Sequence, residues 1–157
     1  MKFVCDRMLG KLAIWLRISG YDTIYVGDFN FENEDHALLE NFKDRILLTK
    51  DKTLYKKALK EKRAVIYIRS NDVADQMREL KRIGVNFQIV MDRCSVCNTP
   101  LRKPSDDEAL EVLKKEGIKE DLREIYELWF CEKCKKLYWM GGHWKNMVRF
   151  LDKVEKS

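Results

Sequence analysis

Short apolar runs alternate with helical segments four times in the first ninety residues, and this alternation restricts the fold more than any other feature. The apolar runs are KFVCD (2–6), DTIYV (22–26), RILLT (45–49) and AVIYI (64–68). Between and after them, apolar residues recur three and four positions apart, which predicts helices over 7–20, 32–42, 52–62 and 72–84. Strands that alternate with helices over short links predict a parallel α/β sheet with helices on both faces. We also predict a fifth strand at FQIV (87–90).

Four of the five cysteines form two C-x2-C pairs. The pairs are RCSVCN, with Cys94 and Cys97, and FCEKCKK, with Cys131 and Cys134. Two such pairs can place four thiolates in a tetrahedron, the arrangement that structural zinc prefers. Two disulfides or a redox pair would also account for the cysteines, but both fit poorly with the intracellular chain expected here. Because four thiolates fill the coordination sphere, we predict a structural zinc, with Cys5 buried in a strand and uninvolved.

The pattern changes at Arg93, and we predict a sheet domain over 1–92 and a zinc-ribbon domain over 93–157. An acidic helical insert is expected between the two cysteine pairs, from Asp106 to about Leu128. An amphipathic helix is expected at the C-terminus. Its predicted apolar face consists of Trp144, Met147, Val148 and Leu151.

The charge distribution is compatible with a polyanionic partner but does not require one. The 157 residues carry a formal net charge of +5, and the acidic insert separates two basic regions. A solvated surface would explain the same pattern. No apolar run reaches the roughly 20 residues that span a bilayer. Charged residues also interrupt the first apolar stretch, unlike the continuous apolar region of a signal peptide. We expect a cytoplasmic protein with no membrane partner.

Aspartates lie at the ends of several predicted strands or at the starts of the helices that follow. They are Asp6, Asp35, Asp51 and Asp72. The carboxyl ends of neighbouring parallel strands meet in one crevice, and crowded carboxylates need a cation or a shared proton. Hard oxygen ligands select Mg²⁺ or Mn²⁺, ions that can activate water for phosphodiester cleavage. We therefore predict four catalytic acids, with Asp6 and Asp51 as Mg²⁺ or Mn²⁺ ligands.

Helix capping is the alternative explanation for three of these aspartates. A carboxylate at a helix start accepts backbone N–H bonds and contributes about 1 kcal/mol. Asp35, Asp51 and Asp72 each lie near a predicted start, although Thr49 is a rival cap for the helix after Asp51. Asp6 directly follows a strand, so capping explains it least well.

Five segments together resemble the Mut-seven C-terminal ribonuclease family. They are DRMLGKLAIWLR (6–17), RILLTKD (45–51), SNDVADQ (70–76), RCSVCN (93–98) and CEKCKKLYWMGGHW (131–144). The resemblance implies a PIN-like nuclease domain followed by a zinc ribbon, and a metal-dependent ribonuclease. Its acids would be Asp6, Asp35 and Asp51, with Asp72 a fourth. Where zinc knuckles often have glycine, this chain has Asn98 and Lys135, and a left-handed conformation there costs lysine roughly 1–2 kcal/mol.

Basic and aromatic residues give candidate RNA contacts. The predicted phosphate contacts are Arg7, Lys11, Arg17, Lys50 and Lys52. Aromatic rings among basic residues can stack unpaired bases, and LYWMGGHW supplies Tyr138, Trp139 and Trp144. The same rings could instead pack the small ribbon core. The sequence thus predicts a ribonuclease for single-stranded RNA, with a non-catalytic RNA- or protein-binding adaptor of the same fold as the alternative.

Overall fold

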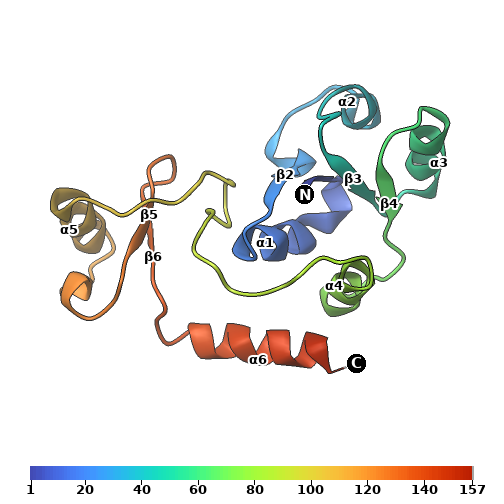
Figure 1. Cartoon of the computed structure of the whole chain (residues 1–157). Helices are drawn as coiled ribbons and strands as arrows, with labels where there is room; N and C mark the ends of the chain where they lie inside the picture. The colour runs from blue at the N-terminus through green and yellow to red at the C-terminus, as the bar shows by residue number, and fades with distance from the viewer. Residues whose placement is uncertain (157) are drawn as a thin grey trace.

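The computed structural model describes residues 1–156, which form a sheet unit and a smaller ribbon unit joined side by side (Figure 1). The sheet unit contains four parallel strands in the order β2-β1-β3-β4. The strands are β1 (Lys2–Cys5), β2 (Asp22–Tyr25), β3 (Ile46–Thr49) and β4 (Val65–Tyr67). The predicted parallel α/β fold is confirmed. Within residues 1–156, no helix is long and apolar enough to cross a membrane.

Helices cover both faces of this sheet because successive strand residues point to opposite sides. Phe3 and Cys5 lie in the core beneath α1 (Gly10–Ile18) and α4 (Val73–Lys81), whereas Val4 lies in the core beneath α2 (Glu34–Glu40) and α3 (Lys52–Lys60). Both core layers cover the central strands, which explains why β1 and β3 are apolar on both sides. Short 3-10 turns precede α1 and follow β2, at Arg7–Leu9 and Val26–Asp28.

The predicted strand at 87–90 is wrong. Its backbone does not join the sheet, because the end of α1 supplies its hydrogen-bond partners instead. The Gln88 amide donates to the Ser19 hydroxyl, and the Val90 amide donates to the Ile18 carbonyl. Phe87 is buried in the α1–α4 core. The apolar residues of this segment therefore pack against a helix end rather than form a fifth strand.

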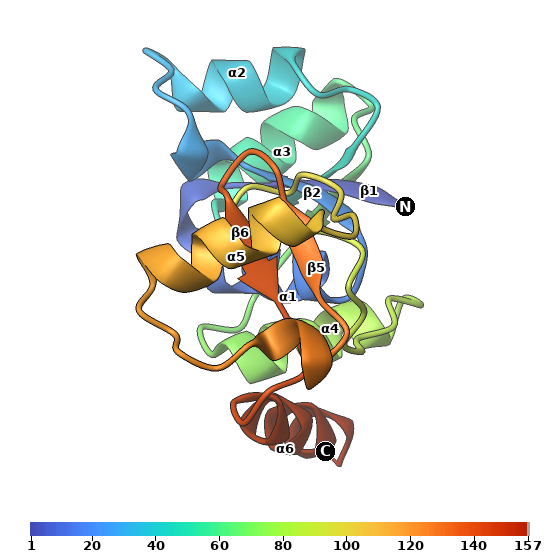
Figure 2. The ribbon, with the colours of Figure 1, turned by 90° about the vertical axis from the view of Figure 1, so that its left-hand side faces the viewer.

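The ribbon unit is built on the antiparallel hairpin of β5 (Trp129–Cys131) and β6 (Lys136–Tyr138). The helix α5 (Asp106–Lys115) crosses this hairpin (Figure 2), and its apolar side contributes Ala109, Val112 and Leu113 to a separate core. The acidic insert is not helical to Leu128 as predicted. Gly117 adopts a positive φ of 69° after α5, and only a 3-10 turn at Leu122–Glu124 follows.

The C-terminal helix α6 (Trp144–Glu155) runs back from the ribbon to the sheet unit and packs there (Figure 1). Phe150 stacks on Trp15 of α1 with ring centroids 4.9 Å apart, and Val154 is buried in the α1–α4 core. The predicted apolar face is only partly correct. Leu151 contacts the core, but Trp144 is 38% exposed.

Candidate functional site

Asp6 lies at the carboxyl end of β1, where three hydrogen bonds hold its carboxylate. Oδ1 accepts from the Met8 amide (3.0 Å), and Oδ2 accepts from the Lys50 amide (2.8 Å) and the Thr49 hydroxyl (2.5 Å). The residue is only 6% exposed. Two of these donors belong to the end of β3, so Asp6 joins the ends of two neighbouring strands.

Asp51 lies on the other side of the same junction and caps α3. Its Oδ1 accepts from the amides of Thr53 (2.9 Å) and Leu54 (3.2 Å). The predicted capping role is therefore real, and Asp51, not Thr49, fills it. Capping uses only one carboxylate oxygen, and among residues 1–156 no hydrogen bond to Oδ2 is formed. The second oxygen is available to a ligand.

The environment of Asp6 acts on its ionisation. Burial raises the pKa of Asp6 above its ordinary value, and the charge of Asp51 raises it further. The hydrogen bonds from Thr49, Lys50 and Met8 act in the opposite direction. A buried carboxylate beside a like charge is stabilised by a cation, so this junction suits a divalent ion.

The position of this junction in the sheet agrees with a ligand site. The strand order β2-β1-β3-β4 reverses between β1 and β3, and open α/β sheets bind ligands outside the carboxyl ends of strands at such a switch point. Asp6 and Asp51 follow these two strands. The carboxyl ends of β1 and β3, called the sheet edge below, therefore carry a fixed carboxylate pair at the switch point where a ligand is expected.

The other two predicted acids are placed differently. Asp72 caps α4, accepting from the Ala74 amide at 2.7 Å. Asp35 is the second residue of α2 and is half-buried, while Asn33 caps that helix. The acid of α2 that reaches the end of β1 is Glu34, whose Oε1 accepts from Arg7 Nη2 at 2.7 Å. In the described part of the chain, the four predicted aspartates do not form a compact group of three or more metal ligands.

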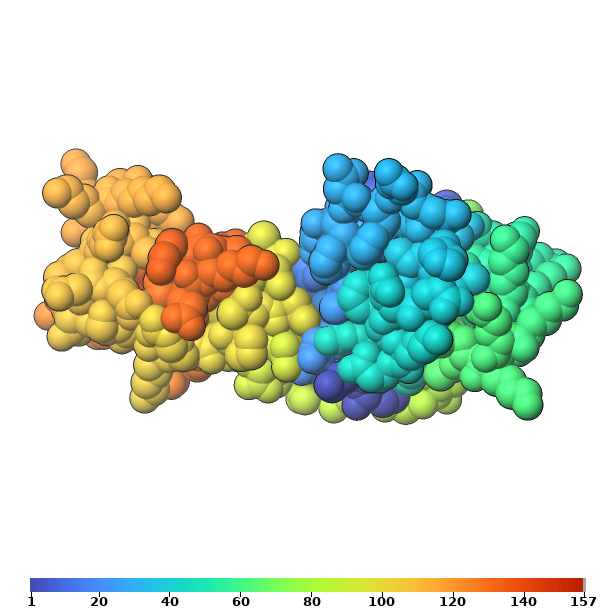
Figure 3. Space-filling model, turned by 90° about the horizontal axis from the view of Figure 1, so that it is seen from above, coloured from blue at the N-terminus to red at the C-terminus, as the bar shows by residue number. Residues whose placement is uncertain are grey.

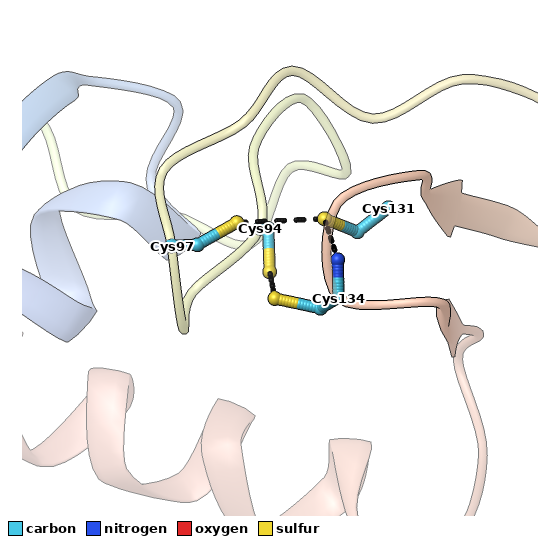
Figure 4. A group of neighbouring side chains, drawn as sticks. All are labelled: Cys94, Cys97, Cys131 and Cys134. Carbon is cyan, nitrogen blue, oxygen red and sulfur yellow. Dashed lines mark hydrogen bonds between the residues drawn. The ribbon is translucent and has the colours of Figure 1, made fainter.

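The four paired cysteines do form such a group (Figure 4). All four Sγ atoms lie within 4.8 Å of one another, with Cys94 and Cys134 3.9 Å apart and Cys97 and Cys131 3.5 Å apart. A Zn–S distance of about 2.3 Å places tetrahedral sulfurs about 3.8 Å apart. The predicted cysteines are thus together, and the group could bind zinc.

Backbone conformation and thiol acidity both fit a zinc ribbon. Asn98 and Lys135 follow the second cysteine of each pair with positive φ of 72° and 54°, as knuckle turns require. Burial and the neighbouring sulfurs raise the pKa of Cys134. Burial also acts against ionisation of Cys97, but its bonds to Thr99 lower its pKa to about 6. Crowded thiols of this kind ionise together only when a cation offsets their charge.

A family model described as the Mut7-C RNAse domain matches residues 1–151. The chain belongs to this family. The match covers the sheet unit, the ribbon unit and most of α6, so the resemblance inferred from the five sequence segments is confirmed. Comparisons with curated proteins and with solved structures gave no significant match.

The basic residues predicted to contact RNA differ in their exposure within this Mut7-C chain. Arg7, Lys11 and Lys52 are exposed near the sheet edge. Lys50 is half-buried, and its Nζ donates to the Ser70 carbonyl at 2.7 Å. Arg17 is only 3% exposed and is no longer a candidate, because its guanidinium is enclosed between the two units.

Arg17 instead belongs to an interlock between the zinc site and strand β2. Its guanidinium donates to the carbonyls of Thr23 (2.9 Å), Ser95 (3.2 Å) and Val96 (3.1 Å). Asn98 accepts from the Thr23 amide at 3.0 Å and donates to Asp22 at 2.7 Å. The first cysteine turn thereby covers the outer edge of β2, which would otherwise present unpaired backbone groups.

Sequence reasoning assigned no role at this Mut7-C site to three residues that shape it. Thr49 bonds Asp6, and Glu34 pairs with Arg7. The Tyr25 hydroxyl donates to the Arg7 carbonyl at 2.6 Å, and its pKa is raised by burial and by the charges of nearby acids including Asp28, Glu34 and Asp6. The position of Thr49 two residues before Asp51 was the one available signal.

Proposed function

We propose that this chain is a metal-dependent ribonuclease that hydrolyses phosphodiester bonds of single-stranded RNA at the carboxyl ends of the central strands β1 and β3. The observation that carries the proposal is the pairing of Asp6 and Asp51 at the switch point of a chain in the Mut7-C RNAse domain family. No nucleophilic side chain is needed, because the attacking group in such reactions is water.

The carboxylate pair fits Mg²⁺ or Mn²⁺ by its chemistry. These ions prefer oxygen ligands and retain several waters, so they need only one or two protein carboxylates. Asp51 offers a free Oδ2, and Asp6 is fixed in place by its three donors. A bound ion would lower the pKa of a bound water and offset the phosphate charge.

The chain's own residues would bind and orient the RNA. Arg7 follows Asp6 directly, and its side chain is 60% exposed although its guanidinium pairs with Glu34 at 2.7 Å, so its outer face would contact a phosphate. Lys11 and Lys52 add positive charge around the same edge. The ribbon unit would extend the RNA-binding surface, with its zinc keeping it folded.

The test is cleavage of a labelled single-stranded RNA by zinc-loaded protein, with and without added Mg²⁺ or Mn²⁺. Cleavage should require the added ion and fall about 100-fold or more in Asp6→Asn and Asp51→Asn. Asp44→Asn, a change at an exposed aspartate whose partner is Lys2 at 3.8 Å, is the matched control.

A non-catalytic adaptor is the second candidate, favoured by one observation. Among residues 1–156, no third carboxylate joins Asp6 and Asp51 within ligand distance. If both variants cut as well as the parent, or if no RNA is cut with either ion while RNA still binds, the adaptor is the better description.

A further inference from the structure

A cavity of about 320 Å³ lies between the sheet unit and the ribbon unit. It is bounded by the end of α1, the segment 89–95, β6 and the start of α6, elements that can be followed in Figure 1. Aromatic side chains make up much of its wall: Tyr138, Trp139, His143 and Trp144. None of the acids at the sheet edge lines it.

We propose that this cavity binds an unpaired base of single-stranded RNA, at a position several nucleotides from the cut. The inference rests on the proposed function for its substrate and adds a second recognition site to it. The cavity lies at the small end of the range of about 300–1,000 Å³ found for ligand pockets. That size suits one base and its sugar rather than a large cofactor.

Core packing explains some of these rings but not all of them. Tyr138 is held by the zinc site, with its hydroxyl 3.0 Å from Cys94 Sγ. Trp139 packs one side on the ribbon core. Trp144 is 38% exposed at the start of α6, so no core accounts for its position. A partly exposed indole beside a cavity can serve as a platform for a stacked base.

The local backbone is adapted to place Trp139 at this wall. A Cβ atom on Gly141 would lie 2.5 Å from Nε1 of Trp139, so only glycine lets the chain pass so close to the indole. His143 then meets the same ring edge-on, with centroids 6.3 Å apart. The GGH segment therefore folds back over Trp139 and sets the geometry of the wall.

The charge at the cavity suits a nucleotide. Two basic residues, Arg93 and Lys136, line it with a single acid, Glu116. Lys136 extends its ammonium over the Tyr138 ring, 5.0 Å from the centroid, and Lys145 is exposed next to Trp144. A base that enters the cavity would bring its phosphates near these ammonium groups, an arrangement of stacking platform and positive charge typical of single-strand binding.

The cavity and the acids lie at opposite ends of α1. Asp6 precedes that helix, whereas Ile18 at its last turn lines the cavity. Nine helical residues span about 13 Å, so one nucleotide cannot occupy both places. The first cysteine turn lies between, since Ser95 faces this cavity and Val96 faces a second hollow that Tyr25 and Lys133 also line.

A strand held in the cavity would therefore pass over the zinc site toward Tyr25, whose hydroxyl contacts the Arg7 carbonyl beside Asp6. In the view from above, the outline narrows where the ribbon unit, in yellow and orange, meets the blue part of the sheet unit (Figure 3). On this path the ribbon sets the distance between the held base and the scissile bond.

The experiment scans a 2-aminopurine base through a twelve-nucleotide single-stranded RNA bound to zinc-loaded protein without added Mg²⁺ or Mn²⁺. Stacking on an indole quenches 2-aminopurine, so one position should be quenched more than the others. Trp144→Ala should remove that quenching and weaken binding about 5- to 100-fold, while Trp144→Phe keeps a stacking ring and should retain both. Ile125→Ala, a 56% exposed residue of the same unit outside the cavity, is the matched control.

Two results would overturn the proposal. One is equal quenching at every position, and the other is unchanged binding by Trp144→Ala. Self-association of the parent that Trp144→Ala abolishes would assign the cavity to a second copy of the chain instead. Position-specific quenching that persists in Asp51→Asn supports the base site even if no RNA is cut. The quenching experiment therefore tests the base site separately from the proposed ribonuclease activity.

Discussion

The Thr49 hydroxyl donates to Oδ2 of Asp6 over 2.5 Å. The Thr49 hydroxyl oxygen in turn accepts a hydrogen bond from the Asp51 amide over 2.9 Å. One fully buried side chain therefore connects Asp6 and Asp51. The segment Thr49–Asp51 thus does more than end a strand. Its threonine fixes the orientation of one acid and the backbone of the other.

Thr49→Val should impair the site without changing its shape. Valine has the same volume but no hydroxyl, so the Asp6 carboxylate loses a buried donor, which costs about 1–3 kcal/mol of folding stability. Loss of a group that orients a metal ligand typically lowers metal affinity or activity about 10- to 100-fold. Denaturant unfolding, Mn²⁺ titration and RNA cleavage measure these effects.

Two variants control for this change. Thr49→Ser keeps the hydroxyl and should behave much like the parent. Thr53→Val alters an exposed threonine of α3 and should leave both metal affinity and cleavage unchanged. Full cleavage by Thr49→Val would mean that Asp6 does not need this orientation.

The sequence predicted the sheet edge well because strand ends and helix starts are local features. The runs KFVCD and RILLT are apolar on both faces, and their last residues had to meet at one edge of a parallel sheet. The choice between Asp35 and Glu34 could not be made in the same way. It depends on Asn33 capping α2, which rotates Glu34 rather than its neighbour toward Arg7.

Long-range contacts explain the remaining errors. Arg17 looked like a solvent cation beside an apolar helix face, but its partners include Ser95 and Val96, nearly eighty residues away. The segment 87–90 has the composition of a strand, yet Ser19 and Ile18 take its amides. Neither outcome follows from periodicity or spacing, because the first depends on where the ribbon unit meets α1 and the second depends on contacts with the end of α1.

Removal of zinc should affect β2 as well as the ribbon. We expect one zinc per chain, lost in Cys131→Ser and retained in Cys5→Ala, as measured by elemental analysis. The turn at Cys94–Asn98 binds the Thr23 amide through Asn98, so loss of the metal should free that amide. Hydrogen exchange at Thr23 should then accelerate in Cys131→Ser, whereas the amide of Leu48 in the central strand should stay protected.

The absence of zinc from protein purified without chelator would contradict the first part of this prediction. Unchanged exchange at Thr23 in metal-free protein would contradict the second, because it would mean that the interlock is formed without the metal.

The ion pairs of Asp22 should make the joint between the units sensitive to acid. Desolvation alone would raise the pKa of Asp22, but the hydrogen bonds from Arg45 and Asn98 and the charge of Arg93 bring it below its ordinary value. A carboxylate with a lowered folded-state pKa stabilises the protein above its unfolded pKa of about 4, and this stability is lost as the pH falls through the lower, folded value.

Asp22→Asn should therefore lower the Tm by about 2–10 °C at pH 7, and the difference from the parent should shrink below pH 4. Thermal melts of both proteins from pH 3 to pH 7, with zinc content checked at each pH, measure this. Asp44→Asn, whose ion pair with Lys2 is exposed, should show no such trend. If the Tm difference between the parent and Asp22→Asn stays constant with pH, the charge of Asp22 does not cause it.

The carboxylate pair at the sheet edge predicts how stability responds to a divalent ion. Asp51→Asn removes a negative charge that raises the pKa of Asp6, and asparagine caps a helix about as well as aspartate. Without added metal, the variant should be as stable as the parent or more so. An ion at 100 times its dissociation constant stabilises a protein by about 2.7 kcal/mol, or roughly 5–10 °C for a chain of this length, and Asp51→Asn should lose this shift.

Asp72→Asn is the matched comparison, because Asp72 caps α4 as Asp51 caps α3. If Asp72 only caps its helix, this variant should keep the full Mn²⁺-induced rise in Tm and most of the RNA cleavage. If Asp72 also binds the ion, both variants should lose the shift. A shift that survives in Asp51→Asn as well would place the ion elsewhere, since the free Oδ2 of Asp51 is the oxygen that the proposed site cannot do without.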